Sequence, residues 1–83
     1  MRITIKLYAF LATYLPPGAV ENVAEIELGA KATVSQVLEL LALPPQQCHL
    51  VLVNGVYIAP GERPSCALKE GDALAVWPQV AGG

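Results

Sequence analysis

The residues best suited to chemistry in this 83-residue chain are the last four, Val80-Ala81-Gly82-Gly83. Because glycine has no Cβ atom, such a segment can enter a channel that side chains would block, and it carries the α-carboxylate at its tip. Glycine makes up about 7% of ordinary sequence, so a terminal pair arises by chance in roughly 0.5% of chains. The alternative is a frayed terminus, since chain ends are commonly disordered. We predict a folded domain over residues 1–78 and a flexible tail over residues 79–83.

The rest of the chain contains few side chains whose type and spacing suit catalysis or metal binding. His49, the single histidine, directly follows Cys48, but no further ligands stand at metal-binding spacing. We therefore expect a structural or surface role for His49, no metal site, and unpaired thiols at Cys48 and Cys66. No Ser/His/Asp or Cys/His constellation for nucleophilic catalysis is apparent. The acidic residues that we expect to lie in loops, where a basic groove on a partner could meet them, are Glu62, Glu70 and Asp72.

The composition narrows the class of protein. Hydrophobic residues make up 54% of the chain, charged residues only 14%, and the net charge is −2. The chain therefore lacks the basic surface that binds nucleic acid, and we expect no such partner. Some apolar surface should remain exposed, which favours a protein partner. No apolar run reaches ~18 residues, so we expect no membrane span, and two cysteines suit a cytoplasmic protein with reduced thiols.

The first half of the chain predicts two strands and a short helical segment. Residues 2–8 alternate between apolar and polar side chains, which is typical of a half-buried strand. The apolar set is Ile3, Ile5 and Leu7, and the polar set is Arg2, Thr4 and Lys6. Residues 9–15 fit one or two helical turns that Pro16-Pro17-Gly18 ends. Residues 23–28 form a second strand, and its glutamates suit a solvated sheet edge.

The clearest helix begins at Thr33. Thr33 and Gln36 have the spacing of a capping box, in which each side chain satisfies a free backbone N–H group of the first turn. A core-facing stripe at helical spacing follows: Val34, Val37, Leu38 and Leu41. Two prolines, Pro44 and Pro45, forbid continuation, so the helix should end near Ala42 or Leu43.

The second half predicts a hairpin and a final strand. Residues 50–53 and 56–59 are β-prone runs separated by Asn54-Gly55, a strong signal for a tight hairpin. Residues 69–72 read as a turn before the last strand, residues 73–77. One helix and four or five strands indicate an α+β protein, with a mixed sheet and the helix packed across one face. The other face of the sheet is then left open.

Strand parity places apolar side chains on that open face. If Leu74 and Val76 point into the core, Ala75 and Trp77 point outward, and in the hairpin Leu50 and Leu52 do the same. We predict that Leu50, Leu52, Ala75 and Trp77 form one apolar patch beside the root of the tail and that a partner binds there. The alternative is that Trp77 merely covers the sheet edge. Phe10 is a weaker candidate for the same interface. The alternative is that Phe10 is a core residue.

These features together resemble the ubiquitin-like β-grasp sulfur carriers of the MoaD/ThiS family, and the resemblance covers the whole chain. It rests on the order of strands and helix, the Val53-Asn54-Gly55 turn, the run Leu68-Lys69-Glu70-Gly71-Asp72 before the last strand, and the ending Pro78-Gln79-Val80-Ala81-Gly82-Gly83. Length and ending are most similar to the small subunit of molybdopterin synthase (MoaD). Gln79 stands where these endings commonly have a proline, and residues 10–14 lack a basic residue often found there.

The resemblance implies a role for the main-chain carboxylate of Gly83. An E1-like activating enzyme of the MoeB type would use ATP to adenylylate it, and a sulfur donor would convert it to a thiocarboxylate. Val80, Ala81, Gly82 and Gly83 would then enter the large, MoaE-type subunit of molybdopterin synthase, where the sulfur passes to a pterin precursor. The chain itself would need no permanently bound cofactor and no catalytic side chains. The alternatives are a ThiS-like or other carrier for a different pathway, a ubiquitin-like protein modifier, and a binding module with an inert tail.

Overall fold

A five-stranded sheet with strand order β2-β1-β5-β3-β4 is the framework of the protein. The computed structural model describes residues 1–79. The strands are β1 (Arg2–Leu7), β2 (Val23–Glu27), β3 (Leu50–Val53), β4 (Val56–Tyr57) and β5 (Ala73–Trp77), and the helices are α1 (Val34–Leu40) and the 3-10 segments η1 (Ala9–Tyr14), η2 (Pro45–Gln47) and η3 (Pro60–Glu62). β1 and β5 pair in parallel at the centre, and the other pairs are antiparallel.

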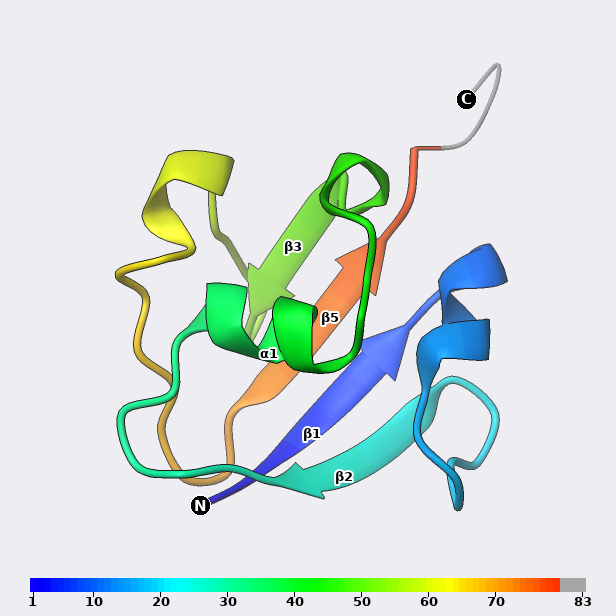
Figure 1. Cartoon of the computed structure of the whole chain (residues 1–83), viewed down its shortest axis with the longest axis horizontal. Coiled ribbons are helices and arrows are strands. Elements are labelled where there is room, and N and C mark those ends of the chain that lie inside the picture. Colours follow the sequence, from blue (N-terminus) through cyan, green and yellow to red (C-terminus); the bar gives the residue numbers. More distant parts are fainter. Residues whose placement is uncertain (80–83) are drawn as a thin grey trace.

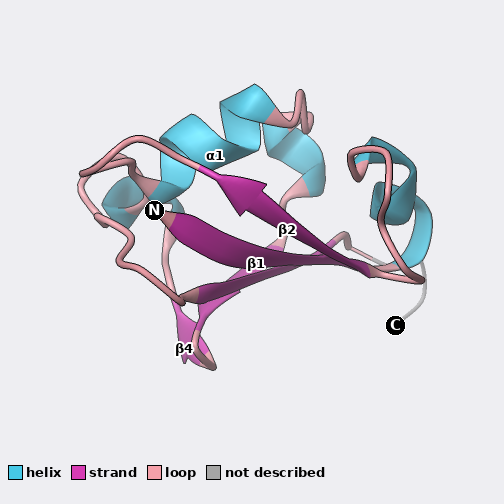
Figure 2. Ribbon diagram, turned by 90° about the horizontal axis from the view of Figure 1, so that it is seen from below, coloured by secondary structure: helices cyan, strands magenta, loops and turns pink. Residues whose placement is uncertain are grey.

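The helix α1 lies across one face of the sheet (Figure 1), and from residues 1–79 no second layer covers the opposite face (Figure 2). The mixed sheet with one main helix confirms the predicted α+β, β-grasp architecture. The edge position of β2 is also confirmed, and its acids are solvated there: Arg2 Nε donates to Glu27 Oε1 at 3.1 Å.

The core lies between α1 and the covered face of the sheet. Alternating side chains of the two central strands enter it, as the periodicity of residues 2–8 predicts. Its completely buried residues include Ile3, Ile5, Leu7, Leu11, Val34, Val37, Val51, Leu74 and Val76. Leu11 comes from η1, so this short segment is packed into the domain rather than lying on its surface.

The helix α1 begins where the sequence predicts and ends earlier. The capping box is present: Gln36 N donates to Thr33 Oγ1 at 3.3 Å, and Thr33 N donates to Gln36 Oε1 at 2.9 Å. The last helical residue is Leu40, because the next residues close the helix with a Schellman motif. Ala42 N donates to Glu39 O, Leu43 N donates to Leu38 O, and Ala42 adopts a left-handed φ of 60°.

The hairpin turn is confirmed, but its second arm is shorter than predicted. Asn54 and Gly55 have φ values of 51° and 82°, as a type I′ turn requires. β4 contains only Val56 and Tyr57 instead of four residues. The strand stops because Ala59 N donates to Glu62 Oε1 at 3.0 Å, which turns the chain into η3.

Asp72 lies in the turn before β5, as predicted, but it is not exposed to a basic groove of a partner. It is 6% exposed, and its two oxygens accept hydrogen bonds from Asn54 Nδ2 at 2.9 Å and Lys69 N at 2.8 Å. The expected access to a partner was wrong because the side chain that binds Asp72, Asn54, lies 18 positions away in the sequence. Asp72 therefore stabilises the turn before β5 and is not available to a partner. Among residues 1–79, no helix is both long enough and apolar enough to cross a membrane.

Candidate functional site

The strand register brings the predicted interface residues onto one face. Leu50 lies opposite Trp77, and Leu52 lies opposite Ala75, in the antiparallel pairing of β3 with β5. The alternate residues of these strands, Val51 and Val76, are completely buried against α1. Leu50, Leu52, Ala75 and Trp77 thus share the open face of the sheet, and we call these four residues the sheet patch.

The members of the sheet patch differ in how much surface they offer. Leu50, Leu52 and Trp77 are half-buried, whereas Ala75 is only 9% exposed. Ala75 has Leu52 opposite it on one side and Lys6 on the other. Its single methyl group therefore forms the floor of the patch, and the larger side chains form the contact surface.

Trp77 is held in place by Tyr8. The two rings are stacked with centroids 4.2 Å apart and an angle of 4° between their planes. Tyr8 N donates to Val76 O at 3.1 Å, so the backbones are joined as well. The sequence analysis did not single out Tyr8, although the alternation of residues 2–8 places it on the same face as Thr4 and Lys6. The stack extends the apolar surface from β5 towards β1.

Two further aromatic residues, Tyr57 and Phe10, are exposed and do not belong to the four-residue sheet patch. Tyr57 is opposite Leu52 on β4 and is 50% exposed, so it extends the patch to the sheet edge. The hairpin register could have predicted this position. Phe10 lies in η1, two residues after Tyr8, and is 52% exposed, which excludes the alternative that it is a core residue.

The root of the tail lies at the end of β5. Trp77 is the last residue of this strand, and its carbonyl oxygen accepts a hydrogen bond from His49 N at 3.1 Å. Pro78 is buried and Gln79 is exposed. In Figure 1 the chain leaves β5 between the beginning of β3 and η1. Val80, Ala81, Gly82 and Gly83 lie outside the described residues, so their predicted role stays a prediction.

Few side chains among residues 1–79 are placed to hold a metal ion or to act as a nucleophile. Residues 1–79 contain no group of three or more His, Cys, Asp or Glu side chains placed to hold a metal ion. Cys48 and Cys66 are both free thiols. Burial raises the pKa of the Cys48 thiol above its ordinary value, an effect that the nearby Arg63 charge partly opposes. Cys48 is therefore protonated at neutral pH and a poor nucleophile.

Comparison with known proteins places the chain among ubiquitin-like sulfur carriers. The model of the ThiS family matches residues 5–83, which is nearly the whole chain. Among solved structures, SAMP1 from Haloferax volcanii is 29% identical, with 100% of both chains covered and a TM-score of 0.67. A second structure, of the H. volcanii small archaeal modifier protein 1, is also 29% identical at a TM-score of 0.67, and covers 95% of this chain and 98% of that one.

A ubiquitin-like protein from Caldiarchaeum subterraneum is 22% identical over 99% of this chain and 100% of its own, with a TM-score of 0.53, and supports the fold alone. No curated protein matches the sequence. The chain belongs to the ThiS family, the MoaD/ThiS type of ubiquitin-like β-grasp sulfur carriers. Proteins of this type typically work with an E1-like activating enzyme.

Proposed function

We propose that the protein carries sulfur as a thiocarboxylate on Gly83 and acts as the small subunit of a molybdopterin synthase. The observation that carries this proposal is the family match, which extends through residue 83 and so includes the Gly82-Gly83 ending. The arrangement of the described residues supports it, because the root of the tail adjoins the partly exposed aromatic and aliphatic sheet patch.

The proposed chemistry needs an activated main-chain carboxylate. A free carboxylate is a poor electrophile, since its negative charge repels nucleophiles. In the activating enzyme, an oxygen of the Gly83 carboxylate attacks the α-phosphate of ATP and pyrophosphate leaves. Sulfide released by a sulfur donor then attacks the acyl-adenylate and AMP leaves, so that sulfur replaces one oxygen. ATP is thus consumed at the partner, and this chain holds no permanent cofactor.

The proposed acceptor complex uses the sheet patch and the tail together. A MoaE-type large subunit binds the open face, and the tail reaches its active site. Residues 79–83 span at most ~17 Å when extended, at ~3.4 Å per residue, which is enough to pass from one domain surface into a neighbouring active site.

Intact-mass spectrometry of the protein purified from its native cell tests the proposal. We expect a species heavier by the difference between sulfur and oxygen, and a co-purifying pterin-binding subunit. An unchanged C-terminal acid under sulfur-replete conditions would contradict the carrier role. A thiocarboxylate without that subunit would contradict only the molybdenum pathway, and favour ThiS-like thiazole synthesis or another acceptor.

A second candidate function is protein modification, and the likeness to SAMP1 favours it. That structure covers all of this chain at 29% identity, and the second structure of the same identity is of a small archaeal modifier protein. The same acyl-adenylate would then be attacked by a lysine amine rather than by a sulfur donor. Tryptic digestion of cellular protein distinguishes the two functions, because a modifier leaves the peptide of residues 70–83, cut after Lys69, in isopeptide linkage on lysines, and a dedicated carrier leaves none.

A further inference from the structure

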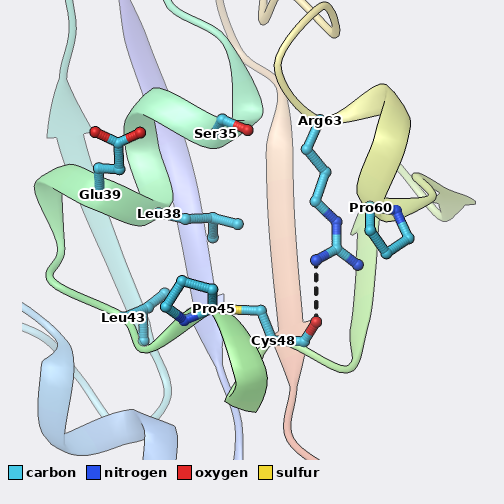
Figure 3. Close-up of a pocket in the computed structure, with 8 residues that line it drawn as sticks. All are labelled: Ser35, Leu38, Glu39, Leu43, Pro45, Cys48, Pro60 and Arg63. Carbon is cyan, nitrogen blue, oxygen red and sulfur yellow. Dashed lines mark hydrogen bonds between the residues drawn. The ribbon is translucent and has the colours of Figure 1, made fainter.

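A cavity of about 290 Å³ lies on the helix-covered side of the protein, away from the sheet patch. It is formed by α1, η2, η3 and the residues next to them (Figure 3). The lining residues are Ser35, Leu38, Glu39, Leu43, Pro45, Cys48, Pro60 and Arg63. This volume is at the lower end of the range of small-molecule sites, about 300–1,000 Å³.

Arg63 supplies a buried positive charge to this cavity. The residue is only 7% exposed. Its Nε donates to Ile58 O at 3.2 Å, and its Nη1 donates to Cys48 O at 3.0 Å. Nη2 is buried and has no hydrogen-bond partner among residues 1–79. Figure 3 shows the guanidinium between Cys48 and Pro60, with Nη2 on the side of Pro60.

The charge of Arg63 is not neutralised by the described part of the chain. Its two hydrogen-bond partners are uncharged carbonyl groups, and the ion pairs among residues 1–79 all involve Met1 or Arg2. Glu39 lines the cavity but is exposed and forms no ion pair with Arg63. A buried charge with an unused N–H donor is costly unless an acceptor, best an anion, meets it. The hydrogen bonds to Ile58 O and Cys48 O account for Nε and Nη1, but no described residue accounts for Nη2.

The cavity walls indicate what kind of anion fits. Leu38, Leu43, Pro45 and Pro60 are apolar, and Ser35 adds one hydroxyl group. We propose that this cavity binds a small apolar carboxylate, whose negative group meets Nη2 of Arg63 and whose hydrocarbon part lies against Leu38 and Leu43. The carboxylate reaches the buried Nη2 from the side of Pro60, because Pro60 lies beside Nη2 and is exposed at the start of η3. This site does not depend on the proposed sulfur-carrier function.

Isovalerate is a suitable probe, and its amide is the matched uncharged control. We would titrate the full ¹⁵N-labelled chain and follow the Arg63 Nε–H signal and the amides of Leu38 and Cys48. Isovalerate should shift these signals saturably, with a Kd of about the millimolar order for so small a ligand. Isovaleramide should bind at least about tenfold more weakly, because it cannot neutralise the guanidinium. Inorganic phosphate, which has charge but no apolar part, should also be at least about tenfold weaker.

Two variants test the residues. Arg63→Met should abolish the binding, provided that its spectrum keeps the native dispersion. Glu39→Gln, at an exposed position that leaves the fold intact, should tighten isovalerate binding about two- to threefold by removing a like charge at the rim. The proposal is overturned if isovalerate gives no saturable shift up to about 100 mM, if acid and amide bind equally, or if phosphate binds as well as isovalerate. It is also overturned if Glu39→Gln weakens the binding.

Discussion

Trp77 is held at the end of the central strand β5 by Tyr8, so its ring is oriented before any partner arrives. A pre-oriented aromatic side chain loses little conformational entropy on binding, and tryptophan is enriched among residues that dominate interface energies. The alternative is that the ring only covers the sheet edge. The two hypotheses differ in the expected effect on partner affinity.

We predict that Trp77→Ala weakens binding of the proposed large subunit by about 30-fold or more, which corresponds to ~2 kcal/mol. Leu40→Ala is the matched control, because Leu40 is a large exposed apolar residue on α1, which covers the other face. It should leave affinity unchanged. Isothermal titration with each folded variant checks the prediction, and equal affinities for Trp77→Ala and the native chain would leave the ring as an edge cover.

Ala42 carries a backbone conformation that suits glycine better. Its φ of 60° closes the Schellman motif after α1, and a Cβ atom makes that region unfavourable by about 1–2 kcal/mol. We predict that Ala42→Gly raises the free energy of unfolding by about 0.5–1 kcal/mol, because glycine removes the strain of the positive φ. The gain is smaller than the strain itself, because glycine also increases the conformational entropy of the unfolded chain. Denaturant titration measures this change. Ala30→Gly, at a position that does not itself have a positive φ, should be neutral or destabilising, and an equal gain there would contradict the explanation.

The two cysteines should differ in reactivity. Cys48 is buried, its pKa is raised by that burial, and its Sγ lies 3.5 Å from Pro44 O, whereas Cys66 is partly exposed. A higher pKa means less thiolate at neutral pH, and burial blocks access. We predict that a thiol reagent modifies Cys66 at least about tenfold faster than Cys48 in the native protein. Peptide mapping over time measures both rates, and in denaturant they should converge.

At the scale of elements, a hydrogen-bonded clamp joins the hairpin turn to the beginning of β5. Asn54 Nδ2 donates to Asp72 Oδ1 at 2.9 Å, and Ala73 N donates to Asn54 Oδ1 at 2.9 Å. Lys69 N completes the clamp by donating to Asp72 Oδ2. Asn54 thus has two roles: it adopts the positive φ of the turn, and its side chain links two strands.

Two substitutions separate these roles. Asn54→Gly keeps the backbone freedom and removes the side-chain bonds, so we predict a loss of about 1–2 kcal/mol in unfolding free energy, with buried Asp72 left short of a donor. Asn54→Ala should lose about 1 kcal/mol more, because alanine also resists positive φ. Chemical denaturation of both variants measures the two steps. If Asn54→Gly is as stable as the native chain, the clamp contributes nothing.

The elements that the sequence predicts correctly are those encoded by neighbouring residues. The capping box at Thr33 and Gln36, the Asn54-Gly55 turn and the alternation of β1 each depend on residues within a few positions. Two of the features that it misses depend on distant residues. The clamp of Asp72 joins residues 18 apart, and Arg63 reaches Cys48 across 15 positions. The candidate interface is predicted only in part. Strand parity predicts the face of the sheet on which it lies, but only the fold brings Tyr8 against Trp77.

At the scale of the whole molecule, the fold separates a binding surface from the predicted reactive end. The central strand β5 has the sheet patch on one face, the core on the other, and the tail at its end. The aromatic stack and the strand register fix the patch within the described domain. The chemistry that we propose belongs to Gly83, beyond that domain. Binding and sulfur transfer should therefore respond to different substitutions.

We predict that Gly83→Ala leaves unfolding free energy and partner affinity unchanged but lowers sulfur transfer by about 100-fold or more, because a Cβ at the tip misplaces the reacting carbonyl in a narrow channel. Gln79→Ala, at an exposed position nearer the domain, is the matched control and should transfer sulfur normally. A reconstituted assay that starts from thiocarboxylated protein isolates transfer from activation, and titration calorimetry gives the affinity of the same samples. Unchanged transfer by Gly83→Ala would contradict the carrier mechanism. A parallel loss of affinity and transfer would instead show that tail and patch form one binding unit.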